Sequence, residues 1–368
     1  MSKCVYCMKI ENETTFKRRE HVIPQFLGTF EPDNPSMKGD LVCDDCNSKV
    51  FSKLEINFVA DSYEGLYSQM WDITNSGMVR IKGRNLDMQT VTGFGDKFPD
   101  EFFPFLKYEG EKPVVKLRPQ LKVRNYVDGY QVFTYDSLQK IKAGGKGKFN
   151  RFKKRLRMMP ETDMALFGGS NDGSTEEINR FIKLLNDLGI SYNEKVRKYA
   201  SNKNIEGKSI QINYKCTIDR DLMRVIAKIV FNYFIYCTEQ DGSYYKNFLY
   251  EANFDKLRNF IYNGSGDWKE IVKFSKQKAI LDIEGDGSIR ILAHTIQFTL
   301  KGDLIMAKIS LFGQWIYEVE IGKYPLSTQT KFGCGHMFDP FSKSIHPIGP
   351  DKYSLNRLTD SGFGWFKI

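Results

Sequence analysis

Four cysteines near the N-terminus form two C-x-x-C pairs, Cys4 with Cys7 and Cys43 with Cys46. Two thiolates at this spacing can turn onto one Zn²⁺, and two such pairs complete a tetrahedral Cys₄ site. A segment of about 45 residues buries little apolar surface, so a structural metal is expected to hold it together. Buried free cysteines or disulfides are the alternative, but paired spacing at both ends favours zinc.

Any chemistry in this segment needs a second centre, because a Cys₄ zinc has no open coordination position. Between the cysteine pairs, Glu20 and His21 are adjacent and follow Arg18 and Arg19, and Asn47 comes directly after the last cysteine. A neutral imidazole with a pKa near 6.5 is a good general base at neutral pH. Carboxylate and amide oxygens suit Mg²⁺ better than zinc. The plainer alternative is a surface histidine in a zinc-stabilised interaction domain.

Residues 1–55 resemble the HNH (ββα-metal) endonuclease family, in the subgroup with a Cys₄ zinc, an E-H-V-I-P turn and a closing C-x-x-C-N. The resemblance implies a β-hairpin and a helix around one catalytic ion, Mg²⁺ or Mn²⁺. It implies that His21 activates the attacking water, that Glu20 and Asn47 hold the divalent ion, and that the four cysteines hold the zinc. The bracing asparagine of many members is Asp40 here, which leaves the role of Asp40 open. The last position is Asn47 rather than histidine.

The net charge of +9 is unevenly distributed along the chain. Residues 1–60 hold 8 Lys/Arg against 9 Asp/Glu, whereas residues 107–160 hold 15 against 4. A basic stretch of this kind is typical of binding to a phosphate backbone. The catalytic residues and the main contact with nucleic acid are therefore expected in different parts of the chain.

The most basic run, residues 140–157, ends in a predicted amphipathic helix with Phe149, Phe152 and Leu156 on its apolar side. A solvated charged surface is the alternative, and the Gly-Gly-Lys-Gly stretch in this run lacks the P-loop pattern. The residues predicted to bind nucleic acid are Arg18, Arg19, Lys146, Lys148, Arg151, Lys153, Lys154, Arg155 and Arg157.

The remaining sequence predicts an α+β protein. Apolar residues recur at helical spacing over 178–188, 222–234 and 254–262, and residues 289–300, 304–311 and 315–321 alternate as an antiparallel β-meander. Three parts are expected: an HNH module at 1–60, a basic strand-containing region at 61–170, and an α+β domain at 171–368.

The expected function is a metal-dependent HNH endonuclease acting on DNA, with RNA not excluded, in a prokaryotic or phage restriction, defence or mobile-element context. One alternative is a non-catalytic, zinc-dependent nucleic-acid binder. The other is a nuclease kept silent by a ligand-sensing C-terminal domain. Under each of these hypotheses the chain could form a homo-oligomer or bind a partner defence protein. No apolar run reaches about 18 residues and Cys4 leaves no room for a signal peptide, so a cytoplasmic location without membrane contact is expected.

Overall fold

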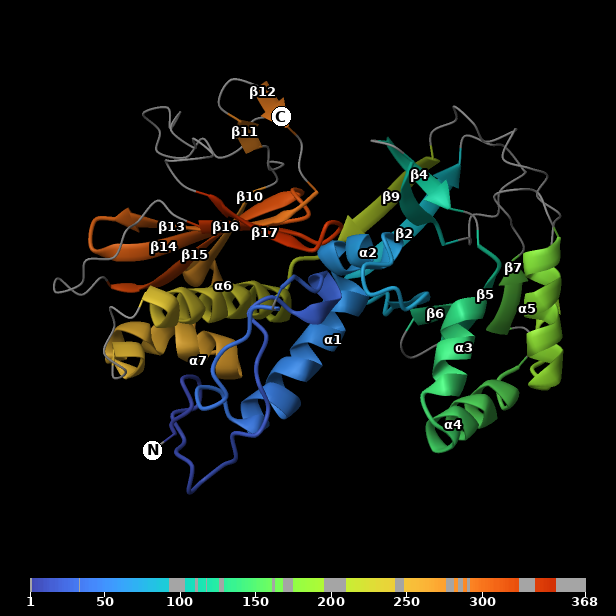
Figure 1. Ribbon diagram of the computed structural model, residues 1–368, viewed down its shortest axis with the longest axis horizontal. Coiled ribbons are helices and arrows are strands. Elements are labelled where there is room, and N and C mark those ends of the chain that lie inside the picture. Colours follow the sequence, from blue (N-terminus) through green and yellow to red (C-terminus); the bar gives the residue numbers. More distant parts are fainter. Residues whose placement is uncertain are drawn as a thin grey trace. The chain divides into compact units, whose positions relative to one another are not determined.

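The α+β class is confirmed by the computed structural model, which contains helices and mainly antiparallel sheets (Figure 1). It describes residues 2–32, 34–92, 103–109, 112–116, 118–125, 129–160, 163–167, 175–194, 210–241, 248–275, 281–283, 287–289, 292–323 and 335–348.

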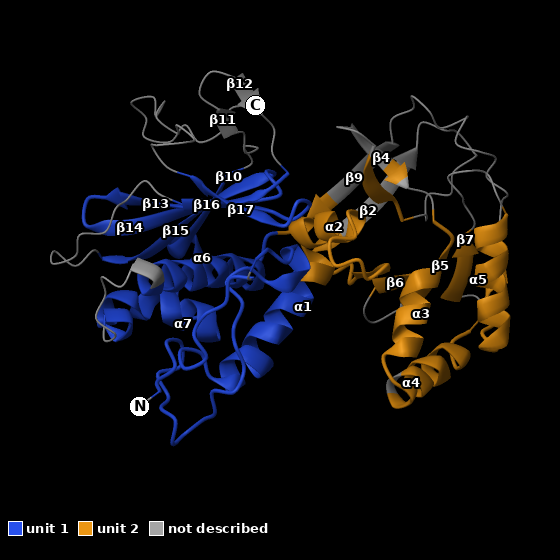
Figure 2. Cartoon of the chain, viewed as in Figure 1, with its two compact units in different colours: residues 1–58, 218–368 blue, residues 59–217 orange. Residues whose placement is uncertain are grey.

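The chain forms two compact units, one of residues 1–58 with 218–368 and the other of residues 59–217 (Figure 2). The sequence-based division into 1–60, 61–170 and 171–368 therefore differs from the structure. The N-terminal segment shares a unit with the C-terminal part of the chain, and the middle unit continues well past residue 170.

The N-terminal segment is held to the C-terminal part by hydrogen bonds and ring contacts. The buried His294 accepts from the Phe312 N–H, and its Nε2 therefore donates to the carbonyl of Leu27, 2.8 Å away. The Tyr250 hydroxyl donates to the carbonyl of Lys3 at 2.8 Å. The rings of Phe30 and Phe338 pack 5.4 Å apart. These contacts are the physical reason for the shared unit.

The described part of residues 2–45 contains isolated β-bridges in place of the expected β-hairpin, one of them between His21 and Ser36. Around it, the Val22 N–H donates to the carbonyl of Pro35 and the Met37 N–H to that of Glu20, both at 2.9 Å. Since Pro35 has no N–H, it cannot extend this ladder. The helical part of the expected module is present as a π-helical turn, η2 (Cys46–Phe51), continued by α1 (Ser52–Asp61). A 3₁₀ turn, η1 (Gln25–Leu27), follows the E-H-V-I-P stretch.

A long helix, α6 (Arg220–Asp241), contacts the C-terminal antiparallel sheet (Figure 1). Its buried apolar side chains include Val225, Ile226, Ile229 and Val230. The predicted meander is confirmed, although its first strand begins at His294 rather than residue 289. The sheet order is β10 (Val272–Ser275), β15 (Trp315–Lys323), β14 (Leu304–Leu311), β13 (His294–Lys301), β16 (Gly335–Asp339) and β17 (Ser344–Ile348).

Shorter elements complete this unit. They are η6 (Phe248–Tyr250), η7 (Ala252–Phe254), α7 (Asp255–Asn263), α8 (Trp268–Ile271) and the paired strands β11 (Leu281–Ile283) and β12 (Gly287–Ile289).

The unit of residues 59–217 is built on a sheet. Three helices pack on it around an apolar core that includes Leu121, Phe133, Leu166 and Phe181, and a second apolar cluster includes Leu66, Val79 and Val132. The sheet order is β1 (Met78–Ile81), β6 (Gly129–Thr134), β5 (Gln120–Asn125), β7 (Met164–Phe167) and β8 (Asn193–Glu194). The helices are α3 (Tyr135–Ala143), α4 (Lys146–Arg157) and α5 (Glu176–Asp187). The other elements are α2 (Tyr63–Met70) and the strand pairs β2 (Leu86–Thr92) with β9 (Ile210–Cys216) and β3 (Phe105–Glu109) with β4 (Lys112–Lys116).

Candidate functional site

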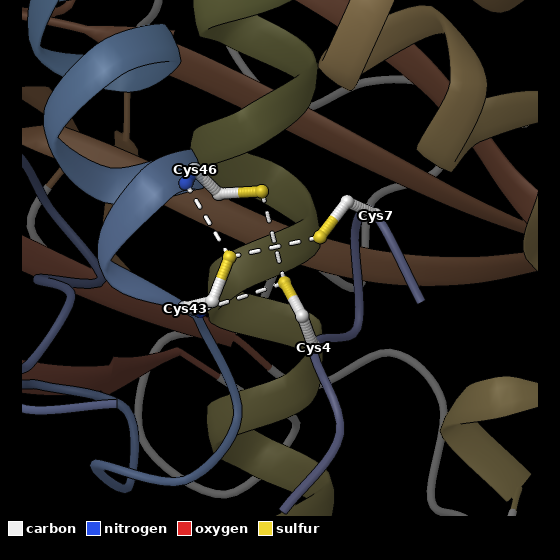
Figure 3. A group of neighbouring side chains, drawn as sticks. All are labelled: Cys4, Cys7, Cys43 and Cys46. Carbon is white, nitrogen blue, oxygen red and sulfur yellow. Dashed lines mark hydrogen bonds between the residues drawn. The ribbon is translucent and has the colours of Figure 1, made fainter. Parts of the chain in front are cut away.

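The four cysteines form one cluster that could hold a zinc ion, and all their sulfurs lie within 4.8 Å of one another (Figure 3). The Sγ atoms of Cys4 and Cys46 are 3.7 Å apart, and those of Cys7 and Cys43 are 3.6 Å apart. A tetrahedron with Zn–S bonds of about 2.3 Å has edges of about 3.8 Å. The spacing therefore fits one tetrahedral zinc.

Backbone geometry directs these sulfurs toward one centre. Cys4 and Cys7 flank a tight turn, in which the Met8 N–H donates to the Cys4 carbonyl at 3.0 Å. The Cys43 N–H points to the Cys4 sulfur at 3.5 Å, and the Cys46 N–H to the Cys43 sulfur at 3.4 Å. Hydrogen bonds from the thiols of Cys4, Cys46 and Cys7 hold the pKa of Cys43 well below its ordinary 9.0. The thiolate, the form that binds metal, is thus favoured at Cys43, whereas hydrogen bonds within the cluster raise the pKa of Cys4 and Cys46.

The imidazole of His21 is half-buried and contacts a side-chain amide at each ring nitrogen. Gln25 approaches Nε2 at 3.1 Å and Asn34 approaches Nδ1 at 3.1 Å. Asn34 is itself oriented by the Phe30 N–H, which donates to its Oδ1 at 3.2 Å. Burial and the nearby charge of Lys228 hold the pKa of His21 below 6.5, so the neutral, basic ring is favoured at neutral pH.

Sequence reasoning missed Gln25 and Asn34. The resemblance placed the family's bracing position at Asp40, but the structure puts the amide of Asn34 against the His21 ring. Asn34 lies directly before Pro35 in a loop, a position typical of a turn residue. That signal predicts a turn but says nothing of which ring the side chain will meet.

The carboxylate of Glu20 points away from solvent and is only 6% exposed. It forms an ion pair with Lys228 of α6 and accepts a hydrogen bond from Asn232 at 3.3 Å. Asn232 also donates to the carbonyl of His21 at 3.0 Å. Burial raises the pKa of Glu20 above its ordinary 4.5, and the charge of Lys228 opposes that rise. Helix α6 thus contacts both members of the Glu-His pair.

The predicted ligands of the divalent ion both have other partners. Glu20 already faces an ammonium group, and the amide nitrogen of Asn47 donates to the carbonyl of Arg19 at 3.4 Å. Among the described residues, the four cysteines are the one group of at least three Cys, His, Asp or Glu side chains arranged to hold a metal. Glu20 and Asn47 in this arrangement do not fit a catalytic Mg²⁺ or Mn²⁺.

Arg18 and Arg19 are exposed and directly precede the Glu-His pair. The N–H groups of Lys17 and Arg18 donate to the carboxylate of Asp44 at 3.1 and 2.9 Å. This contact ties the arginine segment to the chain beside the second cysteine pair.

The predicted basic helix is confirmed as α4, with Phe149 and Leu156 buried in the core of its unit. The side chains of Lys146, Arg151, Lys154, Arg155 and Arg157 are exposed, that of Lys153 is half-buried, and that of Lys148 lies outside the described residues. Arg157 has a structural contact, because its Nε donates to the Leu188 carbonyl at the end of α5, 2.8 Å away. This basic surface and the cysteine cluster belong to different units.

No helix in the described ranges combines the length and apolar character needed to cross a bilayer. The chain matches no protein-family model, no curated protein and no solved structure.

Proposed function

We propose that the N-terminal segment is a zinc-stapled nuclease site of the HNH type that hydrolyses phosphodiester bonds, with DNA as the favoured substrate and RNA not excluded. The observation that carries this proposal is the imidazole of His21, which two amides orient and which burial and the charge of Lys228 favour as a neutral base. It lies next to two exposed arginines and on a segment that the cysteine cluster anchors.

In this proposal a water molecule replaces one of the two amides at the ring of His21, which removes a proton from it. The resulting hydroxide attacks phosphorus, and the bond to the 3′-oxygen breaks. Arg18 and Arg19 neutralise the phosphate oxygens as charge develops on them. The leaving oxygen takes its proton from solvent. No step is assigned to a divalent ion, because Glu20 is already paired with Lys228.

Replacing His21 with alanine is expected to lower the rate of nucleic-acid cleavage by at least about 100-fold, the usual contribution of a general base. The assay is nicking of supercoiled plasmid and cleavage of labelled single-stranded RNA, with Mg²⁺, Mn²⁺ or EDTA. His346→Ala is the matched control, since the His346 ring contacts Ser344 and lies outside the proposed site.

Zinc content and the circular dichroism spectrum are expected to be unchanged in His21→Ala. Cleavage at the wild-type rate would remove His21 from the mechanism. The absence of cleavage by either protein would favour the alternative of a non-catalytic, zinc-dependent nucleic-acid binder.

The exposed face of α4 is proposed to contact the phosphate backbone. Reversing Arg151, Lys154 and Arg155 to glutamate is expected to weaken DNA binding, and to flatten the plot of log K against log salt by about 0.9 per lost phosphate contact. The measurement is fluorescence anisotropy across a salt series. Lys183→Glu on the exposed side of α5 is the control, and an unchanged slope in the triple variant would identify α4 as a solvated surface.

The restriction, defence or mobile-element context rests on the resemblance alone, as does a homo-oligomer or partner protein. If cleavage appears only under particular conditions, we propose that the C-terminal part of the chain senses a ligand and otherwise keeps the nuclease silent. The contact between α6 and the Glu-His pair supports such a coupling.

A further inference from the structure

A buried ion cluster lies beneath the His21 turn. Lys228 of α6 is fully buried, and its ammonium contacts Glu20 and, at 2.5 Å, Glu55 of α1. The ring of Phe51 lies 5.2 Å from the same nitrogen. One cation is thus shared by two carboxylates in a largely apolar environment.

The cluster is charged rather than neutralised by proton transfer. Burial by itself would lower the pKa of Lys228, but the charges of Glu20 and Glu55 outweigh burial and hold it above its ordinary 10.5. A buried ammonium that is paired in this way stays protonated at neutral pH. Lys228 therefore supplies a permanent positive charge at the Glu20 carboxylate.

Asn232 fixes this arrangement from the same helix. It follows Lys228 by four residues, so both side chains lie on one face of α6. Its Nδ2 reaches the Glu20 carboxylate and the His21 carbonyl, and its Oδ1 accepts from the Tyr6 hydroxyl. Since α6 is a central buried helix of its unit, Lys228 is held at Glu20 by the core and not by a mobile loop.

We infer that the Lys228 ammonium is the resident cation of Glu20, in the place where the HNH resemblance puts a divalent ion. Both cannot share the carboxylate, because a divalent ion within bonding distance of Glu20 would lie close to a like charge that is sequestered from solvent. Glu20 and Lys228 instead position the His21 turn on α6. Lys228 occupies this position whether or not the chain cleaves nucleic acid.

The test is a Mn²⁺ titration of the zinc-loaded full chain, followed by the electron paramagnetic resonance signal of free Mn²⁺. Wild type and Glu20→Gln are compared, with Glu31→Gln as an exposed control. We expect either no Mn²⁺ binding or a Kd that differs by less than twofold between the three proteins. A tenfold or larger loss of affinity confined to Glu20→Gln would overturn the inference.

A second measurement uses Lys228→Ala. This substitution removes the ammonium group and leaves room for an ion beside the carboxylates of Glu20 and Glu55. Its melting temperature is expected to rise with millimolar Mn²⁺, whereas that of wild type and of the double variant Lys228→Ala, Glu20→Gln stays unchanged. An equal response of wild type and Lys228→Ala would show that Lys228 does not occupy a cation position. If Lys228→Ala does not fold, the comparison of wild type with Glu20→Gln decides by itself.

Discussion

Replacing Cys43 with serine is expected to release zinc and unfold the N-terminal segment together. Cys43 is fully buried and its sulfur lies 3.6 Å from that of Cys7, so the substitution removes one of the four sulfurs that could surround the ion. Structural zinc contributes about 10–16 kcal/mol in zinc-finger peptides at neutral pH, which is comparable to or larger than the roughly 5–15 kcal/mol that stabilises a whole domain. Loss of the ion therefore outweighs what the local packing can supply.

Zinc per chain by elemental analysis and amide hydrogen exchange over residues 2–58 are the two measurements for this variant. Cys216→Ser is the matched control, because Cys216 is half-buried and lies in the other unit. A folded Cys43→Ser protein without zinc, with exchange protection like that of wild type, would contradict a structural role for the metal. The same unfolding is expected when a strong chelator removes zinc from wild type.

The second large effect is expected from Lys228→Met, a change that keeps the side-chain volume but removes the charge. It leaves the carboxylates of Glu20 and Glu55 without their cation, and breaking a buried ion pair from one side costs about 3–5 kcal/mol. For a unit of this size the melting temperature should fall by roughly 6–20 °C. Calorimetry and urea unfolding measure both quantities.

Lys256→Met is the control for this variant. Lys256 also contacts two carboxylates, Glu320 at 3.4 Å and Glu270 at 3.6 Å, but its side chain is 48% exposed. Exposed pairs contribute about 0–1 kcal/mol, so little change is expected. The double variant Lys228→Met, Glu20→Gln should recover part of the loss, because it removes one of the two unpaired charges. Equal effects of Lys228→Met and Lys256→Met would show that the buried cluster contributes no more than a surface pair.

Much of the fold could be predicted from local patterns. The C-x-x-C spacing fixes which residues can converge on one metal, since only two residues lie between the members of each pair. The basic helix with Phe149, Phe152 and Leu156 and the meander over 289–321 are also predicted, because their apolar positions repeat at 3.6 and 2 residues. The hairpin was expected from the resemblance alone, and Pro35, which lacks an N–H, limits it to a bridge.

The sequence by itself determined the four sulfur ligands, the position of His21 beside two arginines, and the amphipathic helices and strands. Each cysteine pair, the Arg-Arg-Glu-His run and each amphipathic element depends on residues close together in the chain, whereas the meeting of the two cysteine pairs joins residues 36 and 42 positions apart. Only the tertiary structure decided what Glu20 does, because its partners Lys228 and Asn232 come from a helix about two hundred residues further along the chain. A carboxylate in a motif has the chemistry of a metal ligand, but burial against an ammonium group decides which cation it meets.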